Sequence, residues 1–123
     1  MNDSPFKEEE LEEEAAISAR AQTALQDSGY FQRWQGPFGA VPVQFLAELK
    51  TGEFVYFRAR GKKLSMQIAA TTAHWQESRY LASFEEPYEL SQDPLGAGLC
   101  PKDHCTTQIL TWLKQYRQAI ATA

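Results

Sequence analysis

The feature that most constrains the fold is a series of three alternating segments joined by two short turns, between about residues 41 and 70. Within each segment, apolar and polar residues alternate with a period of two, which is the pattern of half-buried strands. Thr51-Gly52 and Gly61-Lys62 separate the segments, and such glycine-containing pairs are typical of hairpin turns. The sequence therefore predicts a three-stranded antiparallel meander over about 41–70.

The length of the turns predicts which side chains share a face, because a two-residue turn fixes the register of its hairpin. Pairing Lys50 with Glu53 places Leu46 opposite Phe57, and pairing Arg60 with Lys63 extends the same face onto the third strand. The expected core face carries Leu46, Val55, Phe57, Ala59, Leu64, Met66 and Ile68. The other face is expected to mix apolar and cationic groups, namely Val43, Phe45, Leu49, Phe54, Tyr56, Arg58, Arg60, Ser65 and Gln67.

Helical patterns flank the meander on both sides. A capping Ser4 and a terminating Gly29 delimit an acidic N-terminal helix, whose first residues, 1–10, have little to bury and are expected to fray. A C-terminal helix is predicted from Asp103 as its cap, with Ile109, Leu113, Tyr116 and Ile120 on one side.

Two further segments lie between the meander and the C-terminal helix. A fourth strand is predicted at Arg79–Phe84, and 85–102 is expected to be a long loop with a functional role. The chain of 123 residues is expected to be a single α+β domain, 1–123. It should consist of an antiparallel sheet of three to five strands with both terminal helices packed on it.

The charge of the chain limits its partners and its compartment. The formal net charge is −4, whereas binders of phosphate backbones carry a basic surplus. Residues 1–29 carry a local charge of about −6 and residues 30–123 about +2, counted from the sequence. No apolar run approaches the roughly 18 residues of a membrane span, and no secretory signal opens the chain. We therefore expect a cytoplasmic protein without a membrane partner, and the eleven glutamines favour a bacterial source.

The strongest candidate site is a cationic cluster at the second hairpin, flanked by two aromatic residues. It could be a solvated hairpin tip, it could be covered by the acidic N-terminal segment of the same chain, or it could bind an external partner. The sequence leaves these three interpretations open. The predicted partner-binding residues are Phe54, Tyr56, Arg58, Arg60, Lys62 and Lys63.

No catalytic motif is present, so no catalytic residue and no cofactor are predicted. Cys100, His104 and Cys105 are of ligand type, and His74 or Asp103 could complete a zinc site, but the two close ligand pairs of a zinc finger are missing. We therefore predict no metal. Whether the two cysteines are free, bridged or metal-bound stays open at this point.

These observations favour a small non-enzymatic protein-interaction module, such as an inhibitor, an immunity-type protein or an assembly adaptor. Its partner would be another protein or a second copy of the chain, because a face rich in both apolar and cationic groups is expected to be buried. The first alternative is a nucleic-acid-binding module acting through the hairpin 58–63. The second is a small enzyme with a site between the 85–102 loop and the sheet.

Overall fold

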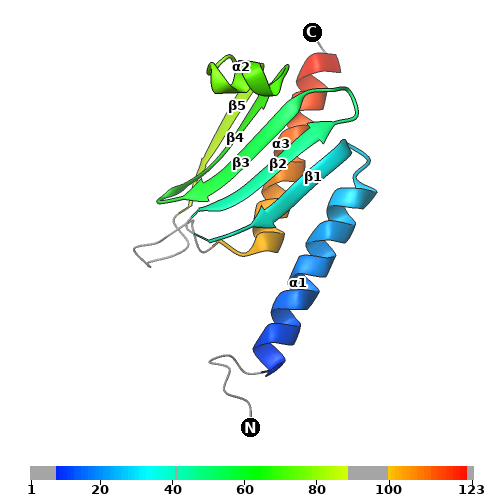
Figure 1. The fold of residues 1–123 in the computed structure, drawn as a ribbon, viewed down its shortest axis with the longest axis vertical. Coiled ribbons are helices and arrows are strands. Elements are labelled where there is room, and N and C mark those ends of the chain that lie inside the picture. The colour runs from blue at the N-terminus through cyan, green and yellow to red at the C-terminus, as the bar shows by residue number, and fades with distance from the viewer. Residues whose placement is uncertain (1–7, 41, 89–99, 122–123) are drawn as a thin grey trace.

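The computed structural model describes residues 8–40, 42–88 and 100–121 of the chain, and these residues form one antiparallel sheet with helices on both of its faces (Figure 1). The spatial order of the strands follows their order in the sequence, β1-β2-β3-β4-β5. The α+β prediction is confirmed. The elements are α1 (Glu8–Asp27), β1 (Phe31–Phe38), β2 (Val43–Leu49), β3 (Phe54–Arg60), β4 (Lys63–Ala69), α2 (Thr72–Gln76), β5 (Ala82–Pro87) and α3 (Lys102–Ala121).

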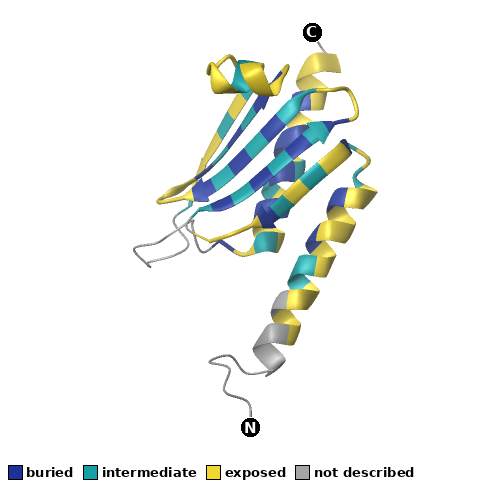
Figure 2. Ribbon diagram, viewed as in Figure 1, coloured by how far each residue is buried: buried dark blue, intermediate teal, exposed yellow. Residues whose placement is uncertain are grey.

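The predicted meander corresponds to β2, β3 and β4, and the register between β3 and β4 is confirmed. Phe57 pairs with Met66, and Arg60 pairs with Lys63 across a two-residue turn. Gly61 opens that turn at φ 63°, a conformation that glycine adopts without steric cost. Buried and half-buried residues alternate along these strands, as Figure 2 shows by its dark stripes.

The predicted register between β2 and β3 is wrong by one residue. Phe45, rather than Leu46, lies opposite Phe57, so Val43, Phe45 and Leu49 are buried in the core and Leu46 lies on the other face. The cause is the turn, in which the Gly52 amide donates to the Leu49 carbonyl and the Leu49 amide donates to the Glu53 carbonyl. Gly52 at φ 100° adds the extra residue of a bulged three-residue loop. A slip of one residue moves every side chain of a strand to the opposite face.

The edge strands differ from the sequence prediction. Strand β1 was not predicted, because Gly36 and Pro37 lie inside it, and its pairing with β2 shifts register between Gln35 and Phe38. The predicted fourth strand is the fifth of the sheet and spans 82–87, three residues further along the chain than expected. Its last three residues therefore belong to the sheet and not to the expected 85–102 loop. Residues 89–99 of that loop lie outside the described residues.

Helix α3 covers the core face of the sheet. Its buried side chains recur at helical spacing and include Ile109, Leu113 and Trp112, whose ring stacks on Phe84 of β5 at 5.6 Å between ring centres. The predicted capping position is two residues late, because the helix begins at Lys102, after Pro101, and Asp103 lies in its first turn.

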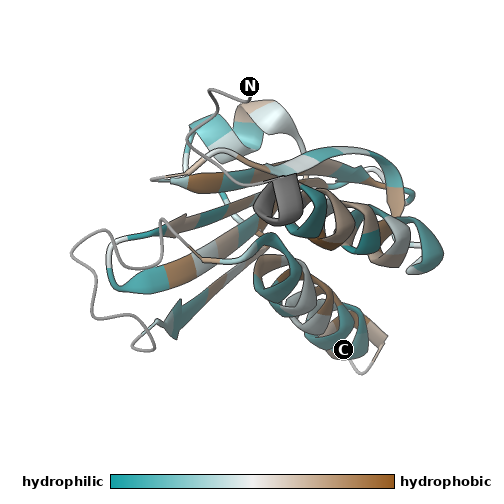
Figure 3. Cartoon of the chain, turned by 90° about the horizontal axis from the view of Figure 1, so that it is seen from below, coloured by the Kyte–Doolittle hydropathy of each residue, from teal (hydrophilic) through white to brown (hydrophobic). Residues whose placement is uncertain are grey.

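Helix α1 lies beside α3 and β1 on this same face of the sheet (Figures 1 and 3). Its contact is narrow, because Ala21 and Leu25 are its buried residues among the side chains described. Gln22 adds a polar tie, since its amide donates to the Gly36 carbonyl and its oxygen accepts a hydrogen bond from Trp34 Nε1 at 2.9 Å. Gly29 follows the helix at φ 74°, as its predicted role in ending the helix requires. Residues 1–7, with the predicted Ser4 cap, lie outside the described residues.

A hydrogen bond ties α3 to the β2–β3 turn. The Tyr116 hydroxyl donates to Glu53 Oε2 at 2.8 Å. Burial raises the pKa of Tyr116 to about 12, and the Glu53 carboxylate adds to this shift. Burial also raises the pKa of Glu53, but hydrogen bonds from Thr51 and Tyr116 outweigh burial, so that the pKa is lowered overall. The neutral phenol and the ionised carboxylate are therefore the forms that the fold stabilises.

The β2 register can be tested by truncating two neighbouring residues. Phe45→Ala should lower the free energy of unfolding by about 3–5 kcal/mol, because it empties a buried site. Leu46→Ala should cost less than the ~2 kcal/mol at the low end for a buried leucine, since Leu46 is only half-buried. Urea unfolding followed by circular dichroism measures both values. A larger loss of stability for Leu46→Ala than for Phe45→Ala would contradict the observed register and favour the one predicted from the sequence.

The bond between Tyr116 and Glu53 predicts how stability depends on pH. Tyr116→Phe removes the donor and should lower the free energy of unfolding by about 1 kcal/mol at pH 7. Because the folded-state pKa of Glu53 is lowered, the contribution of its carboxylate to the free energy of unfolding is lost as the pH falls below about 4.5. Because the pKa of Tyr116 is raised, the wild-type chain should also lose stability between about pH 10 and 12. Unfolding curves at pH 3, 7 and 11 compare the two chains, and an equal difference at all three would contradict this coupling.

Candidate functional site

The face of the sheet opposite α1 and α3 carries a hollow of about 510 Å³, which we call the cup. Its volume lies within the range of about 300–1,000 Å³ that is usual for ligand sites. Residues of strands β3, β4 and β5 form its floor, and residues of α2 and of the turn that follows form its wall. Figure 1 shows α2 at one end of these strands. The residues that line it are Tyr56, Arg58, Arg60, Lys63, Ser65, Gln67, Trp75, Tyr80 and Glu85.

Trp75 holds the wall against the floor. Its ring lies 4.9 Å from Tyr56 and 5.4 Å from Phe54 between centres, and its Nε1 donates to Gln67 Oε1 at 3.2 Å. The short helix α2 begins after Thr71, whose hydroxyl accepts a hydrogen bond from the His74 amide. It ends in a turn in which Ser78 adopts φ 59°. This turn brings Tyr80, which is 40% exposed, to the rim of the cup.

Arg58 is the charged group of the cup with the most unusual environment. Its cross-strand neighbours, Gln44 on β2 and Ser65 on β4, are both neutral. Its Nε is buried and has no hydrogen-bond partner among the described residues. A buried donor without a partner costs about 1–3 kcal/mol, so the fold holds this group at a cost. A carboxylate or phosphate oxygen that reached this atom would supply the missing acceptor.

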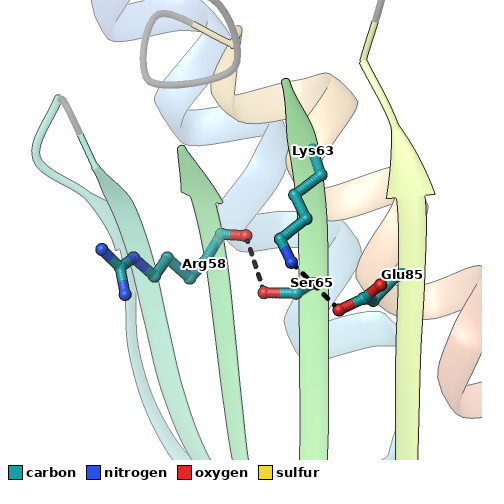
Figure 4. A network of polar contacts seen from close by, with 4 residues as sticks. All are labelled: Arg58, Lys63, Ser65 and Glu85. Carbon is teal, nitrogen blue, oxygen red and sulfur yellow. Dashed lines mark hydrogen bonds and ion pairs between the residues drawn. The ribbon is translucent and has the colours of Figure 1, made fainter. Parts of the chain in front are cut away.

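The other charges of the cup do not neutralise Arg58. Figure 4 shows its guanidinium pointing away from Lys63 and Glu85, which form an exposed ion pair at 3.1 Å between Lys63 Nζ and Glu85 Oε1. Ser65 donates to the Arg58 backbone carbonyl at 3.5 Å, not to its side chain. Among the described residues, the lining holds the cations Arg58, Arg60 and Lys63 and the carboxylate Glu85, so three positive charges less one negative charge leave +2.

Four of the six residues predicted as partner-binding line this cup together, namely Tyr56, Arg58, Arg60 and Lys63. Phe54 also contacts the Trp75 ring and lines a second hollow of about 370 Å³ with Leu46 and Arg33. Lys62 is exposed at the hairpin tip, beside a third hollow. The sequence did not single out Trp75, Tyr80 or Glu85 for this site, because no local pattern tells which face α2 and β5 would reach.

The interpretation that the acidic N-terminal segment covers the cations is wrong for residues 8–27. Helix α1 contacts α3 and β1, on the face of the sheet away from the cup. Within the described part of the chain, the carboxylate beside these cations is instead Glu85 of β5. The mixed face is also less apolar than the sequence predicted, because Val43, Phe45 and Leu49 belong to the core. A broad hydrophobic contact across this face therefore loses its main support, and the cup becomes the more specific candidate.

The residues considered for metal binding lie apart. His74 is in α2 on the cup side, whereas Cys100 and Cys105 are buried at the start of α3 on the other side of the sheet. Among the described residues, no group of three or more histidine, cysteine or acidic side chains could hold a metal ion. The described helices likewise include none that is long and apolar enough to cross a membrane.

Comparisons with models of known protein families, with curated proteins and with solved structures find no match for this chain.

The cost of holding Arg58 in place can be measured directly. Arg58→Met keeps an unbranched side chain as far as the position of Nε but removes the unpartnered donor and the rest of the guanidinium, so the free energy of unfolding should stay unchanged or rise by up to about 1 kcal/mol. Arg33→Met is the matched control, because it removes an exposed pair with Glu48 and should cost about 0.5 kcal/mol. Urea unfolding gives both values. A loss above about 2 kcal/mol for Arg58→Met would assign the residue a structural role instead.

Proposed function

We propose that this chain is a non-enzymatic protein-interaction module that binds an acidic segment of a partner protein in the cup. The observation that carries the proposal is the Arg58 side chain, whose Nε is buried without a partner in a site of charge +2. A glutamate or aspartate side chain would supply the missing acceptor. The proposal keeps the interaction module expected from the sequence and narrows its surface to the cup.

The composition of the lining supports a protein partner. Arginine, tyrosine and tryptophan dominate the binding energy of protein interfaces, and the cup combines Arg58 and Arg60 with Tyr56, Trp75 and Tyr80. These rings line the same cup as Arg58, so a partner residue beside the acid would be aromatic or aliphatic. We therefore propose a short segment in which an acidic residue is adjacent to an apolar one.

A nucleic-acid partner fits these contacts less well. The rings of Tyr56 and Phe54 pack on Trp75 and are not free platforms for bases. Lys63 is paired with Glu85, which also places a negative charge where a phosphate chain would pass. An acidic protein segment is therefore favoured over nucleic acid as the partner.

An enzymatic role also receives little support from the cup. Its aliphatic hydroxyl, Ser65, donates to the Arg58 carbonyl, and no histidine lies in the described lining. A hydroxyl nucleophile needs an adjacent base within hydrogen-bond reach, and this lining does not supply one.

A peptide-display selection tests the proposed partner chemistry. Random peptides would be selected on the wild-type chain and counter-selected on Tyr56→Ala/Arg58→Gln. Enriched peptides should contain an acidic residue next to an aromatic or aliphatic one, and replacing that acid should weaken binding at least tenfold, or about 1.4 kcal/mol. Lys114→Gln, a change of equal charge on α3, is the control and should bind as the wild type does.

Three outcomes would contradict the proposal. One is enrichment of peptides without acidic residues, and another is equal binding to wild type and to the Tyr56/Arg58 variant with an unchanged circular dichroism spectrum. The third is tight, steeply salt-dependent binding of single-stranded oligonucleotides that Arg58→Gln abolishes, which would favour the nucleic-acid alternative.

A further inference from the structure

The two cysteines lie together at the start of α3, on the side of the sheet away from the cup. Cys100 precedes the helix, and Cys105 lies in its first turns. Both are free thiols, with exposed fractions of 3% and 0%. The backbone between them is folded into the beginning of the helix, because the Cys105 amide donates to the Pro101 carbonyl at 3.0 Å.

The two thiols are neighbours within this short segment of the buried core. The Cys105 thiol donates to the Cys100 carbonyl at 4.0 Å, and the Cys100 thiol donates to the Pro101 carbonyl at 3.6 Å. Tyr88 directly follows β5. Its amide donates to the Lys62 carbonyl, and its ring lies 5.8 Å from that of His104 in α3. Three elements therefore converge on the thiol pair.

The two thiols differ in acidity because of these contacts. The hydrogen bond from Cys105, with a further one from Tyr88, holds the pKa of Cys100 below its ordinary value against the opposing effects of burial and of Asp103. The pKa of Cys105 is raised, because its proton is held in the hydrogen bond to Cys100 and because it is buried. One sulfur is thus favoured as a thiolate nucleophile, and its neighbour keeps a proton.

We propose that Cys100 and Cys105 form a redox-active dithiol that closes to an intrachain disulfide by exchange with a low-molecular-weight disulfide such as oxidised glutathione. The Cys100 thiolate attacks one glutathione sulfur, so that a mixed disulfide forms and the first glutathione leaves as a thiolate. That thiolate takes up the proton of Cys105. The Cys105 sulfur then attacks Cys100, the bond from Cys100 to glutathione breaks, and the second glutathione leaves.

The exchange balances in atoms and electrons. The two protein thiols lose two electrons and two protons, and one glutathione disulfide becomes two glutathione thiols. The step needs no metal. The site is distinct from the cup, so this inference and the proposed function can fail independently.

The test uses the full chain in buffers of graded ratios of oxidised to reduced glutathione. After acid quenching and alkylation with N-ethylmaleimide, whole-protein mass spectrometry counts the remaining thiols. The wild type should pass from two alkylated thiols to none, with the loss of two hydrogens and no retained glutathione. Cys105→Ser should instead accumulate glutathione on Cys100, because the second attack is missing. Cys100→Ser should stay reduced under the same conditions.

Controls separate the redox site from a pair of unrelated buried thiols. Circular dichroism checks that each variant is folded, and Cys105→Ala replaces Cys105→Ser if the buried hydroxyl disrupts the helix. Tyr88→Phe keeps the ring and should slow the appearance of the mixed disulfide in the Cys105 variant. Retention of both thiols in the wild type at every ratio would overturn the inference. Equal glutathione adducts on the two single variants would overturn it as well.

Discussion

The structure depends on the register between β2 and β3, which the bulged loop at Gly52 sets. The extra residue in this loop turns Phe45 toward Phe57 in the core and leaves Leu46 and Gln44 on the face with the cup. Tyr116 of α3 holds the same loop through Glu53, so the helix that covers the core also positions the turn. Without the extra residue, the apolar side chains of β2 would point away from the core, and the neutral surroundings of Arg58 would change with them.

This register makes the two faces of the sheet unequal. Among the described residues, helices α1 and α3 cover one face, whereas the five-residue helix α2 lies over one end of the other (Figures 1 and 3). Trp75 attaches that helix through two aromatic contacts and one hydrogen bond, and the floor beside it stays open as the cup. The open floor carries Arg58 and Arg60 with a single carboxylate, Glu85, among the lining residues that the structure describes. An unpartnered buried donor in such a place is costly for folding and useful for binding an anionic group.

Much of this fold could be predicted from the sequence. The alternating residues of β3 and β4 and the short turn at Gly61 predicted both strands and their pairing, because a two-residue turn leaves one register. The loop at Gly52 could not be read this way, since Thr51-Gly52 fits a two-residue turn and a bulged loop equally well. Strand β1 was not predicted, because Gly36 and Pro37 lie within it and interrupt its pairing with β2. The cationic residues of the cup were found as a local cluster, but Trp75 and Tyr80 reach it only through tertiary packing.

The most direct test of the account is an NMR titration that follows the arginine Hε–Nε signals while an acidic peptide selected on the chain is added. The account predicts that the Arg58 signal shifts and that its Hε exchanges more slowly with water, because the Nε gains a carboxylate partner. The signals of Arg20 on α1 and Arg117 on α3 should not move. Peptide binding that leaves the Arg58 signal unchanged and shifts Arg20 or Arg117 instead would contradict the central claim.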